Sequence, residues 1–329
     1  MKIVVDSAIP FLRGVFEPFG EVIYIEGDKF SREVVHNADA LIIRTRTRCN
    51  EELLTGSSVR IIATATIGFD HIDLEWCRRH NIKVVTSAGC NARGVLQWVS
   101  AVLAHIVGTT LPQQLTLGIV GVGAVGSLVK EYAERWGFRT ICCDPPREER
   151  EHLGFVALDE VLRQADIVTL HTPLDKTTHH LINRENISLL RSGATLINAS
   201  RGEVLATDAT RRNDISYAID VWEGEPTVDT DLLDKALIAT PHIAGYSLQG
   251  KANASAQAVA AVAQHLNLPI RDWYPEGVER TVVRPIDWEE LRRSIALHYD
   301  IVGESRHFKS NHHAFEQLRN EYNYRNEYF

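Results

Sequence analysis

The sequence predicts an α/β protein with two doubly wound parallel-sheet domains, Rossmann-like or flavodoxin-like, and a small C-terminal α+β segment. Three observations support this fold class. Short apolar runs alternate with helical patterns along most of the chain. A glycine-rich turn follows one of these runs and opens a helical pattern. After residue 274 the alternation stops, and aromatic side chains stand among charged ones.

Length and composition are those of an ordinary globular enzyme. The 329 residues leave room for two or three domains, and 44% hydrophobic with 24% charged residues are typical globular values. The net charge of −8 argues against a nucleic-acid partner. No apolar stretch reaches the ~18 residues of a membrane span, and the N-terminus is typical of a strand, not a signal peptide. We therefore expect a cytoplasmic protein without a membrane partner. The five cysteines are odd in number and lack ligand-like spacing, which predicts free thiols and no metal site.

The order of the apolar runs predicts where the domains begin and end. The first group of strand-like runs comprises 2–5, 22–25, 40–43, 60–63 and 82–85. A helical pattern over 93–107 follows, and then runs at 115–120, 139–143, 166–170, 194–198, 215–219 and 237–239. A long Ala-rich helix at about 247–266 is expected to return and close the first domain. We therefore expect a discontinuous first domain (1–92 plus 253–275), a second domain that holds the later runs (93–252) and a separate C-terminal domain (276–329).

A dinucleotide-binding fingerprint follows the run at 115–120. This run leads into Gly121-Val-Gly-Ala-Val-Gly126, a helix follows, and the next strand-like run ends in Asp144. Strand, GxGxxG, helix, strand and acid in this order are what a dinucleotide site requires. Asp144 favours NAD over NADP because it would repel a 2′-phosphate, although Arg147 is one hint of NADP. The predicted cofactor contacts here are Gly121, Gly123, Val125, Gly126 and Asp144.

Three reactive side chains each follow a strand-like run, namely Arg201, Glu225 and His242. Open parallel sheets bind ligands at the carboxyl ends of their strands. A guanidinium can bind a carboxylate with two hydrogen bonds, and an imidazole paired with a carboxylate can move a proton. The residues alone leave two acids, at 223 and 225, as candidate partners of the histidine. The alternatives are a surface ion pair for the arginine and a surface or structural role for the histidine.

These motifs together resemble the D-isomer-specific 2-hydroxyacid dehydrogenases, from residue 1 to about residue 265. The resemblance implies that His242 takes the C2 hydroxyl proton, that Glu225 is its partner and that Arg201 binds the substrate carboxylate. On the cofactor side it implies three further contacts, Thr172, Asp220 and Gly245. On the substrate side it implies another three, Thr45, Thr66 and Tyr246. Strand-end capping is the alternative for Thr172 and Asp220.

Further stretches are similar to one branch of that family, which oxidises a phosphorylated 2-hydroxy acid with NAD as a cytoplasmic homodimer. They include residues 64–73 and 88–92, and Phe315-Glu-Gln-Leu-Arg319 with Tyr324-Arg325 in the aromatic C-terminal segment. In that branch the segment forms the dimer interface, and the alternative is a tail packed on its own subunit. Arg44 and Arg46 are candidates for the phosphate or carboxylate end, with solvated arginines as the alternative.

Two alternative functions remain open at this point. One is a dehydrogenase acting on 3-phosphoglycerate or hydroxypyruvate, and the other is an NAD-sensing binding module without turnover. The connection from Ser200 to Asp214 is barely long enough for a loop and a crossover helix, and the resembling family has a longer one. A natural deletion and residues missing from the sequence would both explain this shortness.

Overall fold

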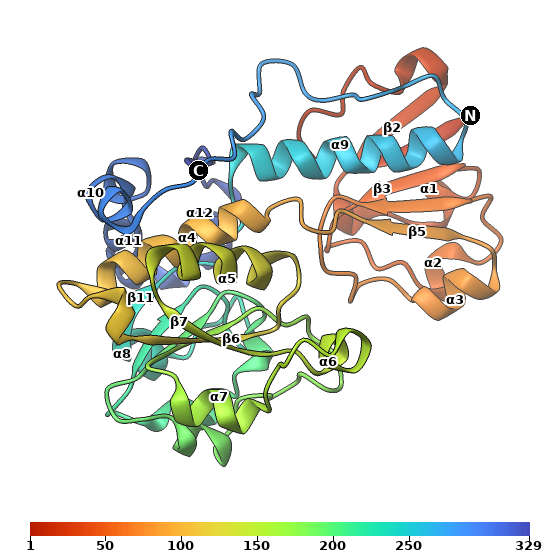
Figure 1. Ribbon diagram of the computed structural model, residues 1–329. Coiled ribbons are helices and arrows are strands. Elements are labelled where there is room, and N and C mark those ends of the chain that lie inside the picture. The colour runs from red at the N-terminus through yellow and green to blue at the C-terminus, as the bar shows by residue number, and fades with distance from the viewer. The chain divides into compact units, whose positions relative to one another are not determined.

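The computed structural model describes residues 1–329, which divide into two compact units (Figure 1). The first unit holds Met1–Asn91 and Leu248–Arg280, and the second holds Ala92–Ser247 and Thr281–Phe329. The segment after residue 280 therefore belongs to the second unit. No helix in the protein is both long and apolar enough to span a membrane.

The first unit is a five-stranded parallel sheet with the order β2-β1-β3-β4-β5. Its strands are β1 (Lys2–Asp6), β2 (Glu21–Ile25), β3 (Ala40–Ile43), β4 (Ile61–Thr64) and β5 (Lys83–Thr86). Its helices are α1 (Arg32–Val35), α2 (Glu51–Leu54), α3 (Leu74–Arg79) and α9 (Leu248–His265), with 3-10 turns η1 (Glu17–Phe19) and η2 (Gly27–Lys29). Both faces are covered, so β3 and β4 are buried along their whole length. The small side chains of α9, among them Ala258 and Val262, pack in one core with β1, β3 and β4.

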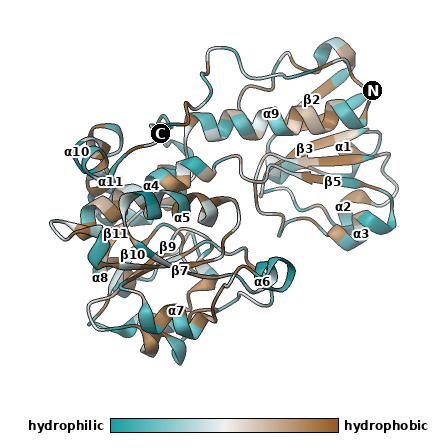
Figure 2. Ribbon diagram, viewed as in Figure 1, coloured by the Kyte–Doolittle hydropathy of each residue, from teal (hydrophilic) through white to brown (hydrophobic).

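The second unit is a six-stranded parallel sheet with the order β11-β10-β9-β8-β6-β7. Its strands are β6 (Thr116–Val120), β7 (Arg139–Cys143), β8 (Ile167–Leu170), β9 (Thr195–Asn198), β10 (Ser216–Ile219) and β11 (Ala236–Ala239). The helices before residue 248 are α4 (Ala92–Val107), α5 (Ala124–Trp136), α6 (Pro145–Glu151), α7 (Leu158–Gln164) and α8 (Thr230–Lys235), with turns η3 (Pro112–Gln114) and η4 (Asn186–Leu189). Figure 2 shows hydrophobic residues along the strands and hydrophilic ones along α3 and α6. The two sheets confirm the predicted fold class.

The short connection between β9 and β10 contains no α-helix. Two 3-10 turns, η5 (Gly202–Val204) and η6 (Thr207–Arg211), take the place of the expected crossover helix. At its start, a Cβ atom on Gly202 would lie 2.1 Å from the carbonyl carbon of Trp222. Only glycine fits there, and this contact holds the Arg201 loop against the chain that follows β10.

The C-terminal segment, residues 281–329, packs on the second unit. It contains α10 (Trp288–His298), α11 (Ile301–Ser310), η7 (His312–Ala314) and α12 (Phe315–Asn320). An α+β arrangement was expected here, but the segment is helical. Its one β-type contact is an isolated bridge between Ser247 and Arg325. Trp288 lies 5.7 Å from Trp136 and 5.5 Å from Phe138, measured between ring centroids. The aromatic residues thus pack on their own subunit, as the alternative interpretation has it, and the dimer interface stays a prediction.

One helix of this segment covers the edge of the sheet. Along α11, the hydroxyl of Ser305 accepts a 2.9 Å hydrogen bond from the N–H of Ala239, and Lys309 donates to the carbonyl of Ala236. Both backbone groups belong to the edge strand β11. Side chains of α11 thus bind polar groups that a further strand would otherwise pair with.

Candidate active site

The glycine loop between β6 and α5 has the shape that a pyrophosphate needs. A Cβ on Gly126 would lie 2.0 Å from the carbonyl oxygen of Gly121, and one on Gly121 would lie 2.8 Å from the backbone of His171. Around Gly123 there is no atom within 4 Å of such a Cβ. Gly121 and Gly126 are therefore needed where backbone segments pack closely, whereas Gly123 leaves open space beside the N-terminus of α5. Val125 lies in the first turn of α5 and packs against the core.

Asp144 follows β7 and is tied to the glycine loop. One carboxylate oxygen accepts the N–H of Val122 at 2.7 Å, and the other accepts the N–H of Arg147 at 3.0 Å. Each oxygen keeps a further lone pair that ribose hydroxyls can use. The guanidinium of Arg147 is held by Glu151 (2.9 Å from Nε) and by the carbonyl of Val122 (2.7 Å from Nη1). These bonds occupy nitrogens of Arg147 that a 2′-phosphate clamp would use.

Thr172 supplies a second feature that fits a bound dinucleotide. Its hydroxyl oxygen is buried and has no hydrogen-bond partner within the protein. Buried polar atoms are rarely left unpaired, so an orphaned hydroxyl after β8 points to a ligand group. The loop glycines, Asp144 and Thr172 together fit NAD, while the contact of each residue with it stays a prediction.

His242 and Glu225 form a pair at the carboxyl ends of β11 and β10. Nδ1 of His242 lies 2.5 Å from Oε1 of Glu225, and both side chains are about one quarter exposed (24%). Nε2 makes no hydrogen bond within the chain. Burial alone would raise the pKa of Glu225, but the hydrogen bond and charge of His242 and the charge of Arg319 outweigh it, so this pKa lies below its ordinary value. The carboxylate therefore stays ionised beside the imidazole.

The second acid of this loop has a different partner. Glu223 lies 2.5 Å from Nε2 of His180 and accepts a 2.7 Å hydrogen bond from the N–H of Thr207. Its carboxylate is therefore occupied by partners other than His242. The geometry separates the two acids, which the residues alone could not do, because only Glu225 contacts His242.

Asp220 holds the loop that carries His242. Its buried carboxylate accepts hydrogen bonds from Thr240 Oγ1 (2.6 Å) and from the N–H groups of Ile243 (2.8 Å) and Ala244 (2.9 Å). Its carbonyl accepts the N–H of His242 at 2.7 Å. These bonds support a left-handed backbone at His242 (φ 59°), which costs energy in a residue other than glycine. Whether Asp220 also contacts NAD stays a prediction.

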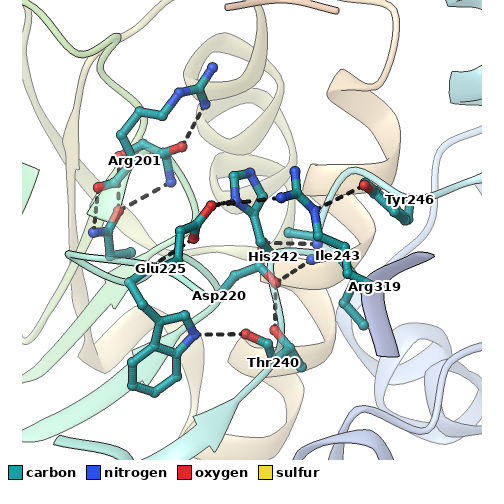
Figure 3. A network of polar contacts seen from close by, with 12 residues as sticks. Arg201, Asp220, Glu225, Thr240, His242, Ile243, Tyr246 and Arg319 are labelled. Atoms are coloured by element: carbon teal, nitrogen blue, oxygen red, sulfur yellow. Dashed lines mark hydrogen bonds and ion pairs between the residues drawn. The ribbon is translucent and has the colours of Figure 1, made fainter. Parts of the chain in front are cut away.

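Arg201 follows β9 and keeps donors available. Asn198 shapes the turn by donating to the carbonyl of Arg201 at 2.9 Å. Nη1 of Arg201 donates to the carbonyl of Ser200 at 2.7 Å, and its other guanidinium nitrogens make no hydrogen bond within the chain. Figure 3 shows the carboxylate of Glu225 beside His242 and joined by a dashed line to Arg319, with Arg201 apart from them. All three predicted catalytic residues thus lie in the second unit.

The predicted substrate residues are divided between the two units. Tyr246 lies in the second unit, in the loop after β11, where Gly245 also packs its backbone near Gly94. Thr45 and Thr66 lie in the first unit, after β3 and β4. Thr45 is exposed, and Thr66 shares a 2.6 Å hydrogen bond with Thr64. Their roles toward a substrate stay predictions.

Arg44 is held in place and is not the freely solvated arginine that was one alternative. Its Nε lies 2.9 Å from Oδ2 of the buried Asp6. The two residues stand at the carboxyl ends of β3 and β1, where the strand order of the first sheet changes direction. This is the usual ligand-binding position in such sheets.

Sequence reasoning missed two functional candidates in the C-terminal segment. Arg319 contacts both Glu225 and Tyr246, and Arg325 binds backbone carbonyls of the His242 loop. Both arginines stand in stretches that were assigned to dimerisation. In the sequence both arginines stand among aromatic residues. This pattern does not show which loop each guanidinium contacts.

Comparison with known proteins agrees with this geometry. Residues 96–244 match the sequence model of the D-isomer specific 2-hydroxyacid dehydrogenase, NAD binding domain. An erythronate-4-phosphate dehydrogenase of Bacteroides fragilis is 43% identical, over 99% of this chain and 97% of the relative. One from Pseudomonas fluorescens is 43% identical over 81% of this chain and 73% of the relative. The NAD+-bound crystal structure of 3-phosphoglycerate dehydrogenase from Entamoeba histolytica has a TM-score of 0.68 and 27% identity, covering 85% of this chain and 99% of that one.

The fold and site define a dehydrogenase of the D-isomer-specific 2-hydroxyacid class, with NAD as its cofactor. Within that class the chain belongs to the erythronate-4-phosphate dehydrogenase family.

Proposed function

We propose that the protein oxidises 4-phospho-D-erythronate to 3-hydroxy-2-oxo-4-phosphooxybutanoate, a step toward pyridoxal 5′-phosphate. The observation that carries this proposal is the His242–Glu225 pair with its unbonded Nε2, in a chain that is 43% identical to named erythronate-4-phosphate dehydrogenases. NAD+, when bound, supplies the acceptor for the hydride that leaves C2.

His242 acts as the general base. Its Nε2 takes the proton of the C2 hydroxyl as the C2–H bond breaks and the C2–O bond becomes a carbonyl. Glu225 accepts the hydrogen bond of Nδ1, which leaves Nε2 as the reacting nitrogen and stabilises the imidazolium that forms. In the reverse direction the imidazolium returns the proton to the carbonyl oxygen.

Arg201 binds the substrate carboxylate. The nitrogens not bonded to Ser200 offer donors, and a planar guanidinium matches a carboxylate with two parallel hydrogen bonds. Its positive charge also stabilises negative charge that develops at the C2 oxygen. On the substrate side we further propose contacts from Tyr246, Thr45 and Thr66.

We also propose that the active protein is a cytoplasmic homodimer. Three apolar side chains of the C-terminal segment are largely exposed: Val282 (74%), Val283 (64%) and Leu297 (84%). Exposed apolar side chains of this size support an interface with a second copy. Five free, buried cysteines support a reducing compartment.

A substrate comparison tests the proposed function. NADH formation, or turnover coupled to a 2-oxo acid that reoxidises retained NADH, is measured with 4-phosphoerythronate, 3-phosphoglycerate and unphosphorylated erythronate. The highest kcat/KM is expected for 4-phosphoerythronate, and a higher value for 3-phosphoglycerate would overturn the assignment. The comparisons with known proteins do not favour the two alternatives, a 3-phosphoglycerate or hydroxypyruvate dehydrogenase and a non-catalytic NAD sensor.

A substitution in the first unit tests the phosphate contact. Thr45→Val removes a hydroxyl and keeps the size of the side chain. The KM for the phosphorylated acid should rise more than the KM for its unphosphorylated analogue. Equal changes for the two acids would exclude Thr45 from phosphate binding.

A further inference from the structure

The environment of Tyr246 and Glu225 is built by the C-terminal segment. Nε of Arg319 donates to the hydroxyl of Tyr246 at 3.0 Å, and its Nη1 lies 3.8 Å from Oε1 of Glu225, the oxygen that faces His242. The rings of Tyr322 and Tyr324 each lie 6.0 Å from the ring of Tyr246 in edge contacts. One guanidinium thus links the acid of the predicted acid–base pair to a predicted substrate residue.

A second arginine anchors the segment to the same loop. The buried guanidinium of Arg325 donates to the carbonyls of Ile243 (3.0 Å), Ala244 and Tyr246 (3.3 Å). It also reaches the carbonyl of Gly94 in α4 at 2.9 Å and stacks 4.3 Å from the ring centroid of Tyr299. A buried guanidinium bound to four backbone carbonyls has little freedom to move, so the chain that follows α12 is held against the His242 loop.

We propose that Arg319 is a positioning residue for the acid–base pair, which holds the ionised carboxylate of Glu225 toward His242 and the hydroxyl of Tyr246 beside it. The C-terminal segment then completes the active site of its own chain, in addition to any contact with a second copy. Arg319 and Arg325 both lie outside residues 96–244, the part that matches the family's sequence model. This inference rests on the proposed function, because it assigns Glu225 and His242 their catalytic roles.

The charged groups around Glu225 determine what loss of Arg319 should do. His242 faces it from the loop after β11, and Arg319 faces it from α12. Asp220 lies behind the same loop with its carboxylate on backbone N–H groups, and Glu223 is paired with His180. Arg319 is thus the permanent cation facing Glu225, and its removal raises the pKa of that carboxyl. Loss of this cation favours protonation of the coupled His242–Glu225 pair, so the acid limb of the rate profile moves to higher pH.

Arg319→Gln, Arg319→Lys and the control Arg306→Gln test this role. Arg306 is an exposed arginine of α11 in the same segment. We measure kcat and kcat/KM for 4-phosphoerythronate against pH, NAD affinity by fluorescence, and the melting temperature. For Arg319→Gln we expect a fall in kcat of at least about tenfold, as small misplacements of catalytic groups produce, and an acid limb at higher pH. NAD affinity should not change. Arg319→Lys should recover the position of the acid limb, and Arg306→Gln should match the unmodified enzyme.

Three results would overturn the proposal. One is a kcat and a pH profile of Arg319→Gln that do not differ from those of the parent enzyme. Another is a loss of kcat in Arg319→Gln without any movement of the acid limb. If Arg319→Gln does not fold, Arg319→Lys decides, because an acid limb at higher pH despite the retained charge would contradict the charge-based role. An unmodified enzyme that never turns over 4-phosphoerythronate would refute the proposed function instead, so the two failures are distinguishable.

Discussion

Asp220 and Arg325 bind one peptide group from opposite ends. The peptide between Ile243 and Ala244 donates its N–H to the carboxylate of Asp220 at 2.9 Å, and its carbonyl accepts from the guanidinium of Arg325 at 3.0 Å. Both side chains are buried. The second peptide after His242 is therefore fixed at its donor and at its acceptor, which helps to maintain the left-handed backbone at residue 242.

Asp220→Asn should destabilise the protein. An amide places donors where backbone N–H groups need an acceptor, and each buried group left unpaired costs about 1–3 kcal/mol. Urea denaturation of Asp220→Asn should give a free energy of unfolding lower by about that amount. The control is Asp234→Asn, at an exposed aspartate of α8, which should leave the free energy of unfolding unchanged. Equal free energies of unfolding for the parent protein and both variants would contradict this role of Asp220.

His242→Asn should reduce kcat by a factor between about 100 and 10,000, the usual contribution of one general acid–base group. NAD affinity, measured by fluorescence, should not change. His180→Gln is a matched control, because His180 also lies 2.5 Å from a glutamate, Glu223, outside the proposed chemistry. A near-normal rate in His242→Asn would remove that residue from the mechanism.

Glu225→Gln should flatten the dependence of stability on acid pH. The folded pKa of Glu225 lies below the ordinary glutamate value of about 4.3, so the unfolded chain binds its proton first as pH falls. The stability from this group is fully present above that ordinary value and is lost as pH falls through the folded pKa. The unfolding free energy of Glu225→Gln should therefore fall less steeply in this range. The exposed Glu149→Gln variant should keep the original slope, and parallel curves for Glu225→Gln would disprove the prediction.

Asp144→Ala should weaken NAD binding and improve the relative use of NADP. Loss of a charge-assisted hydrogen bond costs about 1.5–3 kcal/mol, or roughly 10- to 100-fold in affinity. Arg147→Gln should leave the ratio of NAD to NADP affinity unchanged, because Glu151 already holds that guanidinium. A collapse of this ratio in Arg147→Gln would show that Arg147 reads the 2′ position after all.

The cysteines should resist thiol reagents in the folded protein. Burial raises the pKa of Cys77 and of Cys143 to about 11, and all five cysteines are buried. Because the thiolate is the reactive form, little is present at about pH 8. Ellman's reagent should react with all five thiols only after unfolding. Rapid reaction of the native protein would contradict this burial.

The sequence predicted the strands, the glycine loop and the three catalytic candidates because each depends on local order. An apolar run, a glycine spacing or a strand-end side chain is visible within about ten residues. The partner of His242 was left open by the residues themselves, because Glu223 and Glu225 are two positions apart and only the turn geometry separates them. Arg319 and Arg325 could not be assigned, since their contacts depend on how the C-terminal helices pack. The crossover after Arg201 was expected to hold a helix, and the shortness of the connection leaves only two 3-10 turns.

The helix α11 on β11 has a consequence for experiments on assembly. Without Ser305 and Lys309, the polar backbone groups of an edge strand would be exposed and could recruit strands from other molecules. A chain ended at Arg280 to abolish dimers would therefore tend to aggregate, and light scattering would report that aggregation rather than a monomer. Point substitutions at Val282, Val283 or Leu297, which leave the covered edge intact, are the better test of the proposed dimer.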